Sequence, residues 1–214
     1  MLMQHSVLII IDMQRDFLDA GGYAAMAGMD VAALRRPIPH IRALLDFARK
    51  NNLLVVHTRE GHRPDMCDCP PAKLARSKQA GAEIGSNGPL GKLLIRGEYG
   101  HDIIDELKPI NGEPVVDKPG YGAFHQTDLA QILMSHQITQ LLICGVTTEV
   151  CVQSTLREAV DRGYECVLVS DACGSAYADL HDAAIKVVAV EGGIFGRALT
   201  TEAIIKELGS HHVG

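Results

Sequence analysis

The chain has 214 residues, of which 47% are hydrophobic and 21% charged, and its formal net charge at pH 7 is −6. An acidic chain with no run of lysines or arginines repels a phosphate backbone, so we expect nucleic acid to be excluded as a partner. No apolar run approaches the ~20 residues needed to cross a bilayer, so we expect no membrane span. A length of 214 residues is enough for one domain with a substantial core, and we expect a single domain over residues 1–214.

The first apolar run is VLIII at residues 7–11, and it ends directly at Asp12. No basic region precedes this run and no small-residue cleavage site follows it, so the pattern predicts a buried strand rather than a signal peptide. We therefore expect a cytoplasmic protein.

Later apolar runs recur along the chain with helical patterns between them. Runs without polar alternation are typical of parallel strands that are covered on both faces. The further runs are LLVV at 53–56, VV at 115–116, LLIC at 141–144 and CVLV at 166–169. Helical spacing predicts a helix over residues 38–50 that stops at Asn51, and a second helix with Thr127 as its N-cap. This alternation predicts an α/β fold, a three-layer α/β/α sandwich with a mostly parallel sheet.

Residues 58–100 are rich in proline, glycine and charge, and they predict a long irregular excursion of the kind that often carries function. Whether this excursion covers the active site of its own subunit or of a neighbour is open. The six cysteines are expected to be reduced thiols, and Cys67-x-Cys69 lacks the spacing of a zinc site.

The stretch LLICGVTTEVCVQSTLREAV, at residues 141–160, places Cys151 at the start of a predicted helix that ends at Gly163. The unpaired N–H groups of a first helical turn favour a thiolate, so we expect a lowered pKa and a nucleophilic role for this cysteine. The alternative is a buried cysteine that packs as a small apolar side chain.

Polar side chains also follow two other predicted strands. Asp12 follows VLIII, and Lys118 follows PVVD. Parallel strands present their carboxyl ends at one edge of the sheet, where ligands bind, so Asp12, Lys118 and Cys151 are expected to share one crevice. Together they supply a base, a cation that stabilises a thiolate, and a nucleophile. Separately, Asp12 could cap a helix and Lys118 could be a solvated loop residue.

These residues stand in stretches that resemble the isochorismatase-like cysteine hydrolases, a likeness that runs from about residue 5 to residue 208. The matching stretches are VLIIIDMQRDF, VVDKPGYGAF and LLICGVTTEVCVQSTLREAVDRGYECVLVSDAC. The resemblance implies a catalytic triad of Asp12, Lys118 and Cys151. It also implies a six-stranded parallel sheet between helices, and a homo-oligomer, either a dimer or a tetramer.

The resemblance further implies a cis peptide bond between Val146 and Thr147. The backbone N–H groups of Thr147 and Cys151 would then form an oxyanion hole.

Within the family, the presence of Cys151 places the chain with the amidohydrolases rather than with the vinyl ether hydrolases that lack this cysteine. The loop HTREGHRPDMCDCPPAK resembles that of biuret and ureidoacrylate hydrolases. By the resemblance, Phe17 lies where related enzymes place an aromatic wall over the substrate, and Glu191 lies in the region where biuret-type enzymes present a glutamine. We therefore expect Phe17, Glu191 and the loop residue His62 to contact the substrate. A core role for Phe17 is equally compatible with the sequence. Glu60-Gly61-His62 has a spacing similar to the metal-binding motif of nicotinamidases, but Asp68 stands where a further histidine is expected, so we predict no metal and no cofactor.

The resulting prediction is a cysteine amidohydrolase that releases ammonia from a small ureido or carbamoyl amide. Asp12 takes the thiol proton, returns it to the leaving nitrogen and then activates water. The alternatives are a nicotinamidase-like or other small-amide hydrolase, a vinyl ether hydrolase and a non-catalytic binding protein.

Overall fold

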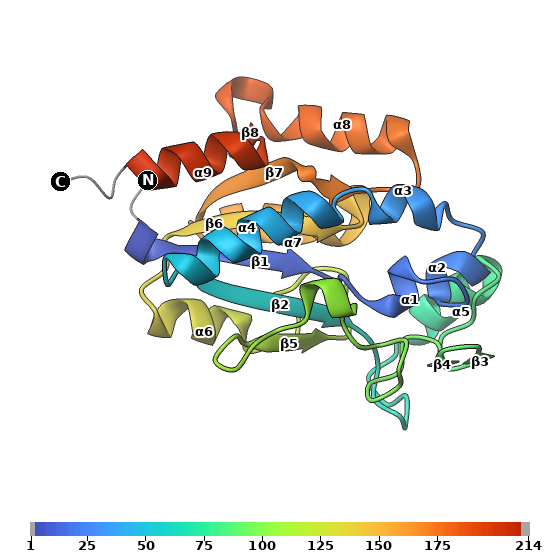
Figure 1. Cartoon of the computed structure of the whole chain (residues 1–214). Helices are drawn as coiled ribbons and strands as arrows, with labels where there is room; N and C mark the ends of the chain where they lie inside the picture. Colours follow the sequence, from blue (N-terminus) through green and yellow to red (C-terminus); the bar gives the residue numbers. More distant parts are fainter. Residues whose placement is uncertain (1–2, 211–214) are drawn as a thin grey trace.

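A six-stranded parallel sheet forms the centre of the computed structural model, which describes residues 3–210 (Figure 1). The strand order is β5-β2-β1-β6-β7-β8. Their bounds are β1 (Ser6–Ile11), β2 (Leu54–Glu60), β5 (Val115–Lys118), β6 (Gln140–Val146), β7 (Glu165–Gly174) and β8 (Arg197–Leu199). The predicted α/β sandwich is confirmed, because β1 and β6 are buried along their whole length, as central parallel strands are.

Helices cover both faces of this sheet. On one face lie α4 (Ile38–Lys50) and α9 (Thr201–Gly209), which contact each other (Figure 1). On the other face lie α7 (Gln153–Asp161) and α6 (Leu129–Ser135), as right-handed crossovers require. α8 (Ala178–Val188) leads to the edge strand β8 through the turn η4 (Val190–Gly192). Among residues 3–210, no helix combines the length and the apolar character of a membrane span.

Several short elements gather around the carboxyl end of the sheet. They are α1 (Arg15–Leu18), α2 (Tyr23–Met26), α3 (Val31–Arg35), α5 (Pro71–Gln79), the hairpin of β3 (Asn87–Gly88) and β4 (Gly91–Lys92), and η2 (Asp105–Leu107). One further short element, η1 (Met3–His5), precedes β1 at the amino end. Of the excursion predicted over residues 58–100, residues 58–60 complete β2, and the remainder contains one helix and a small hairpin within irregular backbone.

Two local predictions need correction. α6 begins at Leu129 with Asp128 as its N-cap, although the Thr127 hydroxyl accepts a hydrogen bond from the Leu129 N–H at 3.3 Å. Cys151 does not lie in the first turn of α7. It lies in the preceding π-helical turn η3 (Thr148–Val152), so the chain makes one wider turn before the regular helix begins at Gln153.

One buried histidine, His101, makes the stability of the fold depend on pH. His101 is 1% exposed, and burial lowers its pKa to about 4 even though Asp117 lies 3.8 Å away and opposes that shift. Arg59 and Arg96 add to the lowering, while Asp102 opposes it. The unfolded chain takes up this proton near pH 6.5, whereas the folded chain takes it up only near pH 4. Stability is therefore lost as the pH falls through this window.

We expect His101→Gln to make the free energy of unfolding less dependent on pH between 6.5 and 4. The difference from wild type corresponds to roughly 3 kcal/mol, at about 1.4 kcal/mol for each tenfold change in proton affinity. Urea titrations of both proteins at several pH values measure it. Equal losses of stability in the two proteins over this window would contradict the role assigned to His101.

Candidate active site

The structure brings Asp12, Lys118 and Cys151 together at the carboxyl edge of the sheet. Lys118 Nζ lies 2.8 Å from Asp12 Oδ2, and both side chains are completely buried. A carboxylate oxygen of Asp12, one of Glu60 and the sulfur of Cys151 all lie within 4.8 Å of one another. We call these four residues, together with Lys73, the catalytic cluster.

Asp12 is fixed by the neighbouring strand β2. It directly follows β1 with a φ of 50°, a left-handed conformation that aspartate tolerates better than most residues. Its N–H donates to Thr58 Oγ1 at 3.2 Å, and the Thr58 hydroxyl donates back to Asp12 Oδ1 at 2.6 Å. Burial raises the pKa of Asp12, with the Glu60 charge adding to the effect and the Lys118 cation opposing it.

Lys118 is the last residue of β5, and its ammonium group is held from several sides. Nζ donates to the carbonyl oxygens of Gly120 at 3.1 Å and Tyr121 at 2.9 Å, in addition to its ion pair with Asp12. Burial acts to lower the pKa of Lys118, but the charges of Asp12, Cys151 and Glu60 outweigh it and hold the pKa above the usual range. The cluster therefore contains a permanent buried cation.

Cys151 is 4% exposed, and the expectation of a lowered thiol pKa is wrong for this structure. Burial raises the pKa of the Cys151 thiol well above its ordinary value. Lys118 opposes that shift, while the charges of Glu60 and Asp12 reinforce it. The sulfur is consequently a thiol at neutral pH, and it needs a proton acceptor within the cluster before it can act as a nucleophile.

Glu60 is a cluster residue that the sequence reasoning considered only as part of a metal motif. It ends β2 and pairs in register with Lys118 on β5. The Cys151 thiol donates to Glu60 Oε2 at 3.3 Å. The rule that identified Asp12 and Lys118, a polar residue at the carboxyl end of a strand, also applies to Glu60. Glu60 was missed because three polar residues, His57, Thr58 and Arg59, separate it from the apolar run, so it does not directly follow that run in the sequence.

Two lysines and a glutamine hold Glu60 in place. Lys73 of α5 lies 2.6 Å from Glu60 Oε1, and Lys118 Nζ lies 3.7 Å from Oε2. The Gln14 side chain accepts from the Glu60 N–H at 2.7 Å and donates to the Glu60 carbonyl at 2.9 Å. Burial acts to raise the pKa of Glu60, but the charges of Lys118 and Lys73 outweigh it and leave the pKa below its usual value.

The peptide bond between Val146 and Thr147 is cis, as the resemblance implies. It lies between the end of β6 and the turn that carries Cys151. Gly145 precedes it with a φ of 117°, opposite Ile11 of β1. A Cβ atom at position 145 would overlap the Ile11 carbonyl oxygen, so this close approach of two strands requires glycine.

We expect Gly145→Ala to destabilise the protein by roughly 2–5 kcal/mol, because it combines a left-handed conformation with overpacking against backbone. Gly28→Ala is the matched control. Gly28 has a φ of 72° with no atom within 4 Å of the added methyl group, and its substitution should cost about 1–2 kcal/mol. Thermal unfolding of both variants checks this, and equal costs would show that the contact with Ile11 is easily relieved.

Phe17 is 7% exposed and belongs to the hydrophobic core, where it makes an edge contact with Tyr23 at 6.0 Å between ring centroids. Tyr23 is a second residue that the sequence reasoning missed. Burial, followed by the charges of Glu60, Tyr121 and Cys151, raises the pKa of Tyr23 to about 12. The charges of the cluster thus act on the Tyr23 hydroxyl, and Phe17 contacts the Tyr23 ring.

His62 is completely buried, and its Nδ1 lies 3.2 Å from Asp68 Oδ1. Burial, assisted by the charge of Lys73, lowers the pKa of His62. The side chains of Glu60 and His62 face different partners. Glu60 pairs with two ammonium groups, while His62 pairs with Asp68.

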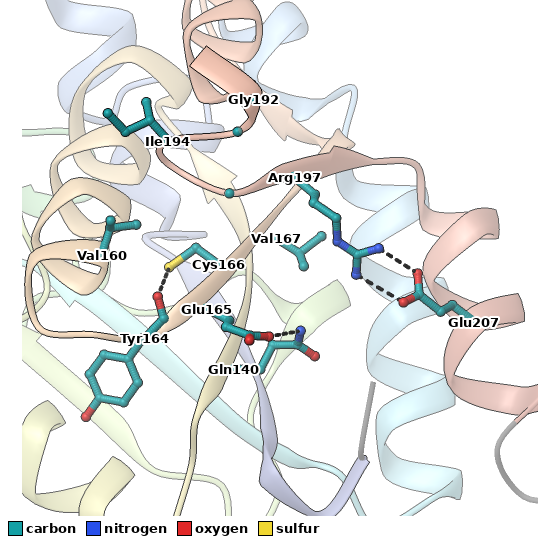
Figure 2. Close-up of a pocket in the computed structure, with 12 residues that line it drawn as sticks. Gln140, Val160, Tyr164, Glu165, Cys166, Val167, Gly192, Ile194, Arg197 and Glu207 are labelled. Atoms are coloured by element: carbon teal, nitrogen blue, oxygen red, sulfur yellow. Dashed lines mark hydrogen bonds and ion pairs between the residues drawn. The ribbon is translucent and has the colours of Figure 1, made fainter. Parts of the chain in front are cut away.

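The structure does not bring Glu191 to the cluster, so its prediction as a substrate contact within this chain is wrong. Glu191 is exposed in η4, beside a cavity of about 450 Å³ at the amino end of the sheet. Figure 2 shows this cavity, with Gly192 and Ile194 above the first residues of β6 and β7. The catalytic cluster lies at the opposite, carboxyl end of the strands.

A cavity of about 730 Å³ adjoins the cluster. Its wall combines part of the excursion, the loop after β5 and the start of α7, and its residues include Lys73, Tyr121 and Ser154. Lys73 connects the cavity to the cluster, because its Nζ contacts Glu60, donates to the Pro119 carbonyl at 2.7 Å and lies 4.9 Å from the centre of the Tyr121 ring. The excursion of this chain therefore contacts the cluster of the same chain through Lys73.

A family model described as the isochorismatase domain matches residues 6–203. The ureidoacrylate amidohydrolase RutB of Enterobacter sp. (strain 638) is 34% identical over 176 residues, which cover 81% of this chain and 76% of that protein.

Solved structures show the same fold. A cysteine hydrolase from Pseudomonas syringae pv. phaseolicola 1448A superposes with a TM-score of 0.83 at 24% identity, covering 98% of this chain and 95% of the other. An isochorismatase family protein from Desulfovibrio vulgaris subsp. vulgaris str. Hildenborough gives a TM-score of 0.78 at 27% identity, with 96% and 98% covered.

Proposed function

This chain belongs to the isochorismatase family, and from that premise we propose that it is a cysteine amidohydrolase. Its substrate is a small ureido or carbamoyl amide, whose C–N bond it cleaves with release of ammonia. The observation that carries the proposal is the Cys151 sulfur within 4.8 Å of two carboxylates, with the Lys118 cation paired to both carboxylates. A buried thiol gains a nucleophilic role when a base and a cation are placed beside it.

The reaction proceeds through an acyl-enzyme. The Cys151 thiol loses its proton to a carboxylate of the cluster, and the sulfur attacks the carbonyl carbon. The backbone N–H groups of Thr147 and Cys151 stabilise the tetrahedral oxyanion, a contribution of ~3–4 kcal/mol per donor in studied hydrolases. The leaving nitrogen takes up a proton and departs as ammonia, and water then cleaves the thioester. Asp12, Lys118 and Cys151 are the proposed triad.

The proposed substrate class is supported by the ureidoacrylate amidohydrolase relative and by the cavity beside the cluster. The 34% identical relative is a ureidoacrylate amidohydrolase by name, and a cavity of about 730 Å³ beside the cluster suits a small molecule. We extend the proposal to a single-domain, cytoplasmic homo-oligomer that uses no cofactor or metal and has neither nucleic acid nor membrane as a partner.

An ammonia assay tests the proposal. The wild-type enzyme is incubated separately with biuret, ureidoacrylate and nicotinamide, while isochorismate is tested in parallel by pyruvate release. We expect ammonia from at least one ureido compound and no pyruvate. Cys151→Ala serves as the control for contaminating amidase. Pyruvate release, or ammonia from nicotinamide alone, would overturn the proposed substrate class.

A further inference from the structure

The turn that carries Cys151 is attached to helix α8 at both of its ends. At the amino end, the Thr148 hydroxyl forms a hydrogen bond of 2.8 Å with His181 Nδ1. At the carboxyl end, the side-chain amide of the cap residue Gln153 donates to the Ala184 carbonyl at 2.7 Å. Residues three apart lie on the same face of a helix, so one face of α8 contacts both ends of η3.

Both hydrogen bonds are buried on the side of the turn. Thr148 is completely buried, and Gln153 is 7% exposed. The Arg157 side chain donates to Gln153 Oε1 at 3.3 Å and so orients that amide, while its guanidinium lies 4.4 Å from the centre of the Phe195 ring. A buried polar group that loses its partner costs the desolvation free energy of that group, so these contacts oppose any displacement of the turn from α8.

The turn itself has an uncommon geometry. η3 is π-helical, and the Val152 N–H donates to the Thr147 carbonyl at 3.2 Å across the wide spacing of such a turn. The N–H groups of Thr147 and Cys151, the proposed oxyanion donors, lie beside and within it. An oxyanion hole acts only when its donors stand about 2.7–3.1 Å from the place where the oxyanion forms. Its efficiency therefore depends on what holds this turn.

We propose that His181 is a positioning residue for the oxyanion hole, and that it acts through the hydroxyl of Thr148. Thr148 directly follows the donor residue Thr147 in the chain, so a fixed Thr148 side chain restricts the backbone on which that donor stands. The expected effect on turnover rests on the proposed amidohydrolase function, whereas the attachment of the turn to α8 can be measured without a substrate.

Substitution of His181 tests this role with biuret or ureidoacrylate, whichever the wild type hydrolyses. His181→Leu removes the hydrogen bond, so kcat should fall about 10- to 100-fold, less than the ~10²–10³-fold cost of removing an oxyanion donor outright. KM should stay within about twofold of the wild-type value, because the oxyanion forms only after the substrate has bound. His181→Asn places an amide where Nδ1 stands and should recover most of kcat. His181→Gln places its amide where Nε2 stands and should not.

Thr148 provides a second route to the same contact. Thr148→Val keeps the shape of the side chain without the hydroxyl and should lower kcat as much as His181→Leu does, whereas Thr148→Ser should retain most of kcat. The double variant Thr148→Val/His181→Leu should be hardly less active than either single variant, because each removes the same interaction. Lys186→Met, an exposed substitution on α8, is the control and should leave kcat unchanged.

Amide hydrogen exchange measures the attachment of the turn in the absence of substrate. Mass spectrometry follows exchange in peptides that cover residues 145–153, with peptides of β1 as the internal reference. In His181→Leu we expect exchange in the turn to be about three- to tenfold faster, as the loss of one net hydrogen bond implies, and exchange in β1 to be unchanged. His181→Asn should exchange as the wild type does.

Three results would overturn the proposal. One is a kcat in His181→Leu within about twofold of wild type, and another is a loss confined to KM. The third is equal recovery by the asparagine and glutamine variants, which would reduce His181 to a residue that fills space. If the wild type hydrolyses no ureido compound while the exchange differences are as expected, the amidohydrolase function alone is rejected and the attachment of the turn to α8 through His181 stands.

Discussion

Replacing Cys151 with alanine is expected to abolish turnover while the protein remains folded. The sulfur is the proposed nucleophile, and no other group of the cluster can form the acyl-enzyme, so kcat should fall by ~10⁴-fold or more. The thiol is 4% exposed and packs in the core, so its loss should cost about 1 kcal/mol of stability. Steady-state ammonia release and thermal unfolding measure the two effects.

Cys166→Ala is the control for this experiment. Cys166 is also buried, and its thiol contacts backbone carbonyl groups. It lies at the amino end of β7, away from the catalytic cluster. The Cys166→Ala substitution should lower the free energy of unfolding by a similar amount and leave kcat near the wild-type value. Retention of more than a few percent of activity in Cys151→Ala would exclude Cys151 as the nucleophile.

The second large effect is expected for Asp12→Asn. Asparagine keeps the shape and an oxygen for the Thr58 hydroxyl, but it neither donates an acid proton to the leaving nitrogen nor accepts one from water. We expect kcat to fall by ~10²–10⁴-fold, the range of a positioned general acid or base. Ammonia release under substrate saturation measures this loss, and single-turnover experiments divide it between acylation and deacylation.

The double variant Asp12→Asn/Cys151→Ala shows whether the residues act as a unit. Without the sulfur there is no acyl-enzyme for Asp12 to assist, so the double variant should be hardly less active than Cys151→Ala. Multiplication of the two losses would mean that Asp12 supports a different reaction path, and near-normal kcat in Asp12→Asn would assign the acid proton to another group.

The sequence predicted the fold and three cluster residues because they depend on local patterns. Continuous apolar runs specify buried strands, and Asp12 and Lys118 stand at the ends of such runs. β8 has three residues and no apolar run, so its own sequence carries too little signal to be recognised as a strand.

The missed features depend on tertiary contacts. The proton affinity of Cys151 is set by its burial and by the charges of Lys118, Glu60 and Asp12, and an argument from the end of a helix contains neither. Lys73 reaches Glu60 from a helix of the excursion, a contact that no spacing rule predicts. Glu191 was placed by analogy of position along the chain, and the structure shows that its turn belongs to the other end of the sheet.

The burial of the Lys118–Asp12 pair has a consequence for experiments in salt. Mobile ions screen charges over ~10 Å at 0.1 M, but only where solvent reaches them. Both side chains of this pair are 0% exposed, whereas those of the surface pair Arg42–Asp46 are 51% and 55% exposed. Added sodium chloride should therefore weaken the surface pair and leave the attraction within the cluster intact. Any dependence of the reaction on ionic strength then reports how a charged substrate approaches the protein, and not the chemistry that follows its entry.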